Sequence, residues 1–531
     1  MASIIDSIKG GIVVSCQAHE EDGLYGPENM ALMAKAAELG GAVGIRADDP
    51  NHIAAIHRTV KLPIIGIYKE DVEGYETRIT LNMDRVKAIY EAGSSIIALD
   101  VTNRPHPYGT TGLEMIKQIK EQFGCLVMAD ISTFEEGVAA AEAGADLVAT
   151  TLSGYTSYSP HMEGPDYALV KRLAQTVKVP VICEGRIASP EHARRLLRMG
   201  AHAIVVGSMI TRPMWITKQY AEAMKQTVRA MTGCAYALDI GGTKIAASIV
   251  NGAGQLLVGP IKASCPQDSR DSVVAACLAL LRQLSQRSEA SSLRPIAVGV
   301  STGGTISRDG RVLYATSSIP DWQGCPLREI SLPVVVCNDG NCAAVAEARL
   351  GSGAACESTL CLTVGTGLGG GVVMNSELVC GSERMAQCFG HMVVCRDGRR
   401  KGENAGAAES YVSGQALCER YNERVEAAKR AASGKEVGER AEAGEAEAVA
   451  CVKEMGEWLG VALASMCACL NPEVVCIGGS VADLGELFLA PVRESFKQNA
   501  FVTIKDTPIV KARFGNDAGV VGAALLALEH C

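Results

Sequence analysis

Short apolar runs and longer amphipathic segments alternate along the first 230 residues of the chain. The apolar runs, which are rich in β-branched side chains, span residues 11–17, 42–46, 63–69, 95–101, 125–132, 147–153, 180–186 and 203–208. Between them lie segments long enough for crossover helices, such as 28–39, 82–92, 134–143 and 191–199. Eight such units predict a (β/α)8 TIM barrel within an α/β fold. The alternative is an open doubly wound sheet, and the polar residues at almost every strand end favour the barrel.

Glycines follow several of the helical segments, at Gly40, Gly93, Gly144 and Gly200. A glycine directly after a helix is typical of the left-handed C′ position that starts a loop back to a strand. These four positions therefore support the boundaries of the βα units.

The pattern starts again after residue 235, where 236–250 read as strand, glycine turn and strand. A chain of 531 residues is too long for one hydrophobic core, which rarely exceeds about 250–300 residues. The junction at 226–234 is short and contains no proline. We therefore expect two domains, residues 1–230 and 235–531.

The composition argues against nucleic-acid-binding, membrane-spanning and secreted proteins. Apolar residues make up 48% and charged residues 21%, and the net charge is −9, which argues against a basic nucleic-acid surface. No apolar run approaches the roughly 20 residues that cross a membrane, and the first ten residues, with Asp6 among them, do not resemble a secretory signal. The 20 cysteines contain no CxxC pair. We expect a cytoplasmic protein with reduced thiols, in which Cys467 and Cys469 pack in a helix.

Polar residues stand where most of the apolar runs of the first half end. They are Gln17, Arg46, Lys69, Asp100, Asp130, Ser153, Glu184 with Gly185 and Arg186, and Gly207 with Ser208 and Arg212. In a (β/α)8 barrel these strand ends form the active-site face, and loops after the last two strands bind phosphate. Lys69 and Glu184 are candidates for a base and an acid, provided that burial or cations lower the lysine pKa. The pattern predicts proton transfer on a small phosphorylated substrate.

Seven strings around these strand ends together form a pattern that is specific enough to identify a protein family. They are VSCQ (14–17), GIRA (44–47), PIIGIYK (63–69), ADIST (129–133), TTLSGYT (150–156), CEGR (183–186) and VGSMITR (206–212). With them the first half resembles the N-acetylmannosamine-6-phosphate 2-epimerase family over its whole length. The resemblance implies metal-independent inversion at C2, with Lys69 and Glu184 as the proton-transfer pair in an order that stays open. It implies that the substrate is held by Gln17, Arg46, Asp130, Ser153, Gly185, Arg186, Gly207, Ser208 and Arg212. Asp100 is either part of this site or a strand-end cap that pairs with Arg104.

Three glycine turns follow apolar runs in the second half: DIGGTK (239–244), GTGLGGG (365–371) and CIGGS (476–480). Glycine allows the backbone to approach phosphate, and the hydroxyl of Thr243 can donate to it. Two phosphate turns on separate strands predict a two-lobed ATPase domain of the actin and hexokinase type, and the third turn fits an adenosine site. The expected nucleotide-binding residues are Asp239, Gly241, Gly242, Thr243, Lys244, Gly365, Thr366, Gly367, Gly478 and Gly479.

Asn338 and Asp339 end a further apolar run, 334–339. Such a pair is common as a helix N-cap, and a carboxylate there can also accept the proton of an attacking sugar hydroxyl. Beside two phosphate turns, we favour Asp339 as the catalytic base.

These turns, with Gly390-His391 and with Glu409 before Tyr411, resemble the ROK family of sugar kinases over residues 235–531. The resemblance implies transfer of phosphate from Mg-ATP to a sugar 6-hydroxyl, with Asp339 as the base. It also implies that Gly303, Asn338, His391 and Glu409 surround the sugar. Transfer would then depend on positioning and charge stabilisation.

Two positions depart from the ROK pattern. Family members usually hold zinc through a CxCGxxGC-like string after the Gly-His pair, but residues 401–409 read KGENAGAAE. A closed zinc site needs four ligands, so we expect no structural zinc despite His391 and Cys395, and the loop must be ordered by other packing. Cys388 replaces the usual glutamate that contacts the sugar near C1 and C2. This replacement argues against a glucose kinase and is compatible with an axial C2 substituent.

The two resemblances together imply consecutive steps of sialic acid catabolism. The kinase would use ATP and Mg2+ to make N-acetylmannosamine 6-phosphate, and the cofactor-free epimerase would convert it to N-acetylglucosamine 6-phosphate. Alternatives are a kinase of broader hexosamine specificity, a kinase domain that has lost its activity, and a sugar-sensing regulator, which would need a basic winged-helix segment that the sequence lacks. We expect a homo-oligomer whose partners are amino sugars and ATP, with neither nucleic acid nor membrane.

Overall fold

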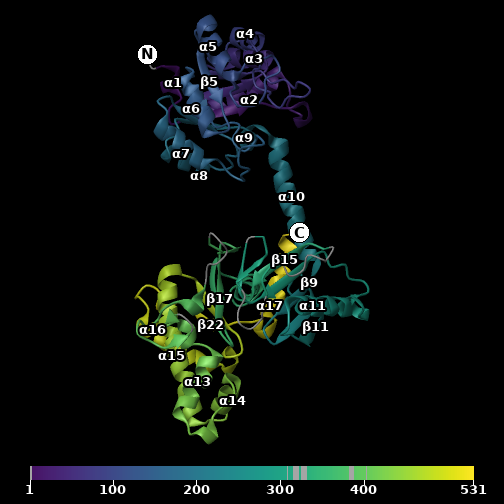
Figure 1. Cartoon of the computed structure of the whole chain (residues 1–531), viewed down its shortest axis with the longest axis vertical. Helices are drawn as coiled ribbons and strands as arrows, with labels where there is room; N and C mark the ends of the chain where they lie inside the picture. The colour runs from purple at the N-terminus through teal and green to yellow at the C-terminus, as the bar shows by residue number, and fades with distance from the viewer. Residues whose placement is uncertain are drawn as a thin grey trace. The chain divides into compact units, whose positions relative to one another are not determined.

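The computed structural model describes residues 3–307, 309–314, 322–324, 332–381, 388–401 and 404–530. The chain divides into two compact units, Met1–Glu222 and Ala223–Cys531. Helix α10 (Pro213–Thr232) contributes residues to both. In Figure 1 the first unit runs from purple to blue and the second from teal to yellow.

The first unit is a closed barrel of eight parallel strands in the order β1 to β8, surrounded by helices (Figure 1). Its strands are β1 (Ile12–Cys16), β2 (Gly44–Asp48), β3 (Ile64–Ile67), β4 (Ile96–Asp100), β5 (Leu126–Asp130), β6 (Leu147–Ala149), β7 (Val181–Glu184) and β8 (Ala203–Val206). The helices are α1 (Ile4–Ser7), α2 (Pro27–Leu39), α3 (Pro50–Thr59), α4 (Met83–Glu91), α5 (Gly112–Phe123), α6 (Phe134–Glu142), α7 (Tyr167–Thr176), α8 (Pro190–Arg198) and α9 (Ser208–Thr211), with the 3-10 turn η1 (Glu20–Asp22). The predicted barrel is thus confirmed.

The strands are shorter than the apolar runs because the last residues of several runs turn away to line the barrel mouth. Arg46 lies in the middle of β2, not at its end, and Lys69 lies two residues beyond β3. The backbone is left-handed at Gly93, Gly144 and Gly200, as expected, with φ of 106°, 100° and 104°. After α2 the left-handed residue is Gly41 (φ 94°), because the predicted Gly40 is still the C-cap in right-handed conformation.

The second unit contains two five-stranded sheets. The first sheet contains β9 (Cys234–Ile240), β10 (Lys244–Asn251), β11 (Leu256–Ser264), β12 (Val298–Thr302) and β15 (Val334–Asn338). The second contains β16 (Ser358–Val364), β17 (Leu368–Met374), β18 (Glu377–Leu378), β21 (Val474–Gly478) and β22 (Ile509–Lys511). Short pairs are formed by β13 (Thr305–Ile306) with β14 (Val312–Tyr314) and by β19 (Arg400–Lys401) with β20 (Asn404–Ala405).

The two sheets have the same plan. Their orders are β11-β10-β9-β12-β15 and β18-β17-β16-β21-β22, so each begins with an antiparallel three-strand meander and continues with two parallel strands. The turn after the central strand is DIGGTK in one sheet and GTGLG in the other. This duplication, which no sequence repeat indicates, places the two glycine turns in equivalent positions.

Helices cover both sheets and pack between them. They are α11 (Arg270–Ser285), α12 (Asp339–Leu350), α13 (Gly414–Arg424), α14 (Gly434–Glu442), α15 (Ala446–Leu470), α16 (Glu486–Asn499) and α17 (Ala518–Glu529), with 3-10 turns η2 (Ser288–Ala290), η3 (Phe389–His391), η4 (Ala408–Ser410), η5 (Ala427–Lys429), η6 (Ala482–Leu484) and η7 (Gly515–Asp517). α12 and α17 share one apolar core with strands of both sheets. Gly522 of α17 lies against α12 so closely that a Cβ would be 1.8 Å from the carbonyl oxygen of Cys342. None of the helices in the described ranges is long and apolar enough to cross a membrane.

Candidate active sites

A cavity of about 1290 Å3 opens at the C-terminal ends of the barrel strands. Of the residues expected at the substrate site, it is lined by Gln17, Arg46, Lys69, Glu184, Gly185, Arg186, Gly207, Ser208 and Arg212. Asp130 and Ser153 are not among its lining residues. Asp130 lies behind Arg46, and the Ser153 hydroxyl donates to Asp166 at 2.8 Å.

The buried centre of this cavity is an arginine held by two carboxylates. Arg46, whose side chain is 1% exposed, donates to both oxygens of Asp130 at 2.6 and 3.0 Å and to Oε2 of Glu184 at 2.7 Å. The Thr151 hydroxyl donates to Asp130 at 2.6 Å and also lies 3.2 Å from Glu184. Burial raises the pKa of Glu184, and the neighbouring Asp130 raises it further, although Arg46 opposes both. Glu184 therefore keeps its proton to a higher pH than an exposed glutamate, which makes it a candidate for the general acid.

Lys69, the other member of the expected proton-transfer pair, lines the same cavity as Glu184. Its ammonium donates to Oε1 of Gln17 at 2.5 Å, and its backbone N–H donates to Asp48 at 2.9 Å. Burial lowers the pKa of Lys69, and the Arg46 charge lowers it as well, while Asp48 opposes the shift. A larger fraction of Lys69 is therefore in the neutral amine form that a base requires than of an exposed lysine at the same pH.

The loops after β7 and β8, where the sequence predicts phosphate binding, line one part of the cavity. Gly207 is the N-cap of α9 and Ser208 begins it, and both residues line the cavity. The first N–H groups of a helix have no partner within the helix. Arg212 contributes a cation, but the structure pairs it with the buried Asp22 at 2.7 Å. Arg186 takes a left-handed conformation (φ 54°) and donates to the carbonyls of Ser153 and Gly164, both at 2.8 Å.

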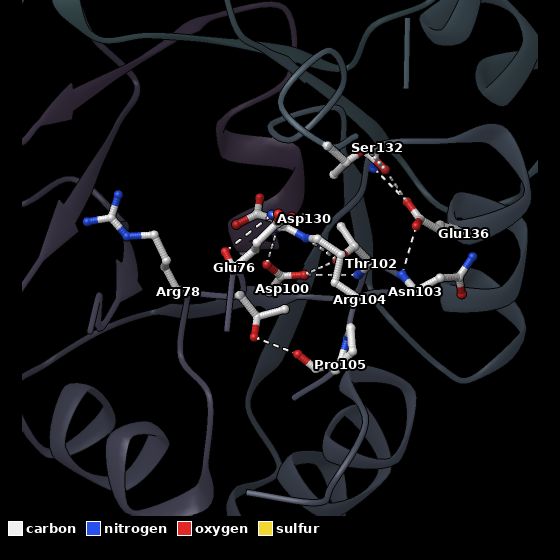
Figure 2. A network of polar contacts seen from close by, with 12 residues as sticks. Glu76, Arg78, Asp100, Thr102, Asn103, Arg104, Pro105, Asp130, Ser132 and Glu136 are labelled. Carbon is white, nitrogen blue, oxygen red and sulfur yellow. Dashed lines mark hydrogen bonds and ion pairs between the residues drawn. The ribbon is translucent and has the colours of Figure 1, made fainter. Parts of the chain in front are cut away.

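Asp100 belongs to a separate polar network at the end of β4 (Figure 2). It accepts from the Thr102 hydroxyl at 2.6 Å, from the Thr102 N–H at 3.0 Å and from Arg104 at 2.7 Å. These bonds are those of the strand-end cap paired with Arg104. Asp100 and Arg104 nevertheless also line the cavity, with Arg78 and Thr151, to which the sequence assigned no role.

In the second unit, two carboxylates, one on β9 and one at the start of α12, are close enough for their charges to interact. Asp239, on β9, accepts from the buried Ser301 hydroxyl at 2.6 Å. Burial raises the pKa of Asp239 to about 6, and the nearby negative charge of Asp339 contributes to this shift. Asp339 has solvent access, but removal of part of its hydration by the surrounding protein still raises its pKa. Carboxylate oxygens are the ligands that Mg2+ prefers, so the Asp239 side chain suits a ligand of a magnesium ion.

Asn338 forms the helix N-cap, which is one of the two interpretations that the sequence left open for this pair. Asn338 is the N-cap of α12 and accepts from the N–H groups of Gly340 and Asn341 at 2.9 and 3.3 Å. Its amide also donates to the carbonyl of Gly304 at 3.0 Å, which draws the Gly303-Gly304 turn to this helix start. Asp339 is the first residue of the helix and leaves one carboxylate oxygen without a hydrogen bond from Gly340. The cap therefore positions Asp339 and does not replace it.

The glycine turns lie close to the residues expected around the sugar. A Cβ on Gly367 would be 2.5 Å from Oε2 of Glu409, and this oxygen accepts the N–H of Leu368 at 2.9 Å. Gly479 packs against Val364, where a Cβ would be 2.4 Å from the carbonyl oxygen. Of the GTGLGGG string, only residues 365–367 form the turn, because 368–371 already belong to β17.

The other expected residues of this unit differ in exposure. Gly241 closes the first turn by donating to the carbonyl of Lys244 at 2.9 Å, and Gly242, Thr243 and Lys244 flank it toward solvent. Thr366 is exposed in the second turn, Gly478 ends β21, and His391 is exposed in η3. Across the described residues, no group of three His, Cys, Asp or Glu side chains could hold a metal ion.

Together, the two units define an enzyme with two active sites, one suited to proton transfer and one to phosphoryl transfer. Residues 30–226 match the family of putative N-acetylmannosamine-6-phosphate epimerases, and residues 235–530 match the ROK family. A bifunctional enzyme NanE/NanK of Brucella melitensis biotype 1 is 32% identical over 529 residues, which cover 99% of this chain and 98% of the relative. The chain therefore belongs to the family of bifunctional NanE/NanK enzymes, in which an epimerase barrel precedes a ROK kinase domain.

Relatives of the separate halves agree. A putative N-acetylmannosamine-6-phosphate 2-epimerase of Caldanaerobacter subterraneus subsp. tengcongensis is 51% identical over 224 residues, covering 42% of this chain and 94% of the relative. The crystal structure of a ROK family glucokinase from Streptomyces griseus, in complex with glucose and AMPPNP, has a TM-score of 0.50 at 33% identity, covering 56% of this chain and 99% of the other.

Proposed function

We propose that the kinase half phosphorylates N-acetylmannosamine at O6 with ATP, and that the barrel then converts the product to N-acetylglucosamine 6-phosphate. The observation that carries the barrel half is the pairing of Lys69 and Glu184 on one cavity, with pKa values shifted in opposite directions. The names of the relatives, above all the putative N-acetylmannosamine-6-phosphate 2-epimerase, support the choice of sugar.

In the barrel, the C2 proton of the ring-opened amino sugar is acidic because it lies next to the aldehyde. One member of the Lys69–Glu184 pair removes this proton, and the other returns a proton to the opposite face of C2. The two residues exchange roles when the reaction runs backward, so both must change protonation state once in each turnover. Arg46 holds Glu184 in place, and the loops at Gly207 and Arg212 hold the phosphate.

In the kinase, Asp339 accepts the proton of the sugar 6-hydroxyl while O6 bonds to the γ-phosphorus and the bond to the β-phosphate oxygen breaks. Asp239 would help to hold Mg2+, which neutralises charge on the phosphates when it is bound, while Asp339 serves as the base. The turns at 241–244 and 365–367 offer N–H groups to the phosphates, and the Gly478-Gly479 turn receives the adenosine. Asn338, Gly303, His391 and Glu409 contact the sugar.

The test is a coupled reaction of the full-length protein with ATP, magnesium and N-acetylmannosamine, followed by NMR. The expected product is N-acetylglucosamine 6-phosphate. Glu184→Gln should stop the reaction at N-acetylmannosamine 6-phosphate, and Asp339→Asn should prevent phosphorylation while added 6-phosphate is still epimerised. Each loss should be at least about 100-fold, the lower range for general acid–base groups. Epimerisation at the wild-type rate by Glu184→Gln would refute the barrel assignment.

A kinase of broader hexosamine specificity is the second candidate. Cys388, exposed beside η3, stands where family members usually have a sugar-binding glutamate, which argues against a glucose kinase and is compatible with an axial C2 substituent. Equal kcat/KM values for N-acetylmannosamine and N-acetylglucosamine would establish this candidate. We also expect the protein to self-associate, which sedimentation velocity would test.

A further inference from the structure

Tyr411 joins the segment between η3 and η4, which includes Gly398 and Arg399, to helix α15 of the second unit. Its hydroxyl accepts the backbone N–H of Arg399 at 2.7 Å. A Cβ on Gly398 would be 2.0 Å from the same oxygen, so the chain passes directly over the phenol. The ring is almost fully buried and packs on Trp458 of α15, with the ring centroids 4.3 Å apart.

The same segment is closed by backbone hydrogen bonds. The N–H groups of Val394 and Cys395 donate to the carbonyl of Gly406 at 2.9 and 3.3 Å, and the Gly406 N–H donates to the carbonyl of Arg399 at 2.8 Å. Gly406 is left-handed (φ 70°), and a Cβ there would be 1.5 Å from the carbonyl oxygen of Cys395. The stretches before and after residues 402–403 therefore run antiparallel and are in close contact at Gly406. The Tyr411 hydroxyl holds the first stretch at Arg399.

The ends of this segment carry the residues expected at the sugar. His391, in η3, precedes it, and Glu409, in η4, ends it two residues before Tyr411. η3 and η4 are joined by the Ala408 N–H, which donates to the carbonyl of Met392 at 2.8 Å. A shift of Tyr411 relative to Arg399 would therefore be passed to Glu409 and, through η4, to His391.

We propose that the Tyr411 hydroxyl is a positioning group for the sugar site, which holds Glu409 and His391 in place through Arg399. This proposal rests on the proposed role of Glu409 and His391 in sugar binding. It assigns Tyr411 no contact with the sugar or with ATP.

Tyr411→Phe removes the hydroxyl and keeps the ring on Trp458. Loss of one hydrogen bond corresponds to about a three- to tenfold change, so we expect the sugar KM to rise by about that factor. The ATP KM and the epimerase rate of the same chain should stay within about twofold of the wild type. Gly398→Ala places a Cβ against the Tyr411 hydroxyl and so displaces residues 398–399 from it. This variant should raise the sugar KM in the same way.

The matched control is Tyr421→Phe, because Tyr421 is also buried in this unit but its hydroxyl bonds Glu445 and Arg440. This variant should leave the sugar KM unchanged. Arg399→Ala should also leave it unchanged, because the backbone N–H remains when the side-chain pair with Glu423 is removed. A sugar KM that is unaffected in both Tyr411→Phe and Gly398→Ala, or sugar and ATP KM values that rise together, would overturn the proposal.

Hydrogen exchange separates this proposal from the proposed function. Without sugar, the amides of residues 394–399 and 404–408 should exchange faster in Tyr411→Phe than in the wild type and in Tyr421→Phe. Wild-type protein that phosphorylates no hexosamine would contradict the proposed function, while faster exchange would still support the tyrosine crosslink. Unchanged exchange would contradict the crosslink itself.

Discussion

Replacing Asp130 with asparagine should destabilise the barrel more than any comparable change at its surface. Arg46 and Asp130 are 1% and 0% exposed, and two hydrogen bonds join them. Removing one partner of a buried ion pair costs about 3–5 kcal/mol. Asparagine fills the same volume and keeps one acceptor, and Glu184 remains 2.7 Å from Arg46, so we expect about 3 kcal/mol.

This loss translates into a measurable shift of the melting temperature. For a unit of 150–250 residues, each kcal/mol lowers Tm by about 2–4 °C, so Asp130→Asn should lower the barrel Tm by about 6–12 °C. The assay is calorimetry of the full chain, with residual epimerase and kinase activities after timed heating to identify which unit unfolds. The kinase should be inactivated at the wild-type temperature.

The control is Asp146→Asn, in the half-exposed pair of Lys120 and Asp146, whose side chains are 36% and 21% exposed. Surface pairs contribute about 0–1 kcal/mol, so this Tm should fall by less than about 4 °C. Equal shifts for the two variants would refute the reasoning that burial of Arg46 sets the magnitude. In Asp130→Asn the pKa of Glu184 should also fall, because a neighbouring negative charge is removed.

Two further predictions concern the kinase. The Asp239 pKa is raised from 3.8 to about 6, so the folded unit holds this proton more tightly than the unfolded chain between these values. Its contribution therefore lowers stability as pH rises through this window. Asp239→Asn should reduce the difference between the free energies of unfolding, measured in urea, at pH 5 and at pH 7. If the carboxylate has the proposed role at Mg2+, phosphorylation should also decline as pH falls through about 6. A Cβ on Gly519 would be 2.7 Å from Oδ1 of Asp239, so Gly519→Ala should raise the KM for Mg-ATP at least about fivefold with epimerisation unchanged, and an unchanged KM would show that Asp239 tolerates displacement.

The sequence by itself determined the fold class, the two families and most candidate residues. Apolar runs followed by helical segments and glycines identified the barrel, because its units are local in sequence and each strand end marks the same face. The strings around Lys69, Glu184, Asp239 and Asp339 carry chemistry in residue types that are uncommon at buried strand ends. Two departures from the ROK pattern, the string KGENAGAAE at 401–409 in place of cysteines and Cys388 in place of a glutamate, needed no coordinates to be noticed.

Only the tertiary structure decided which of these residues meet. It placed Asp130 behind Arg46, turned Ser153 toward Asp166 and paired Arg212 with Asp22, since such contacts join positions far apart in the chain. The common order of the two kinase sheets is also invisible in sequence, because strand pairing depends on backbone geometry that many side chains satisfy. The hydrogen bond from the Arg399 N–H to the Tyr411 hydroxyl also could not be predicted from the sequence. Every residue except proline has a backbone N–H, so the sequence does not indicate which one the tyrosine binds.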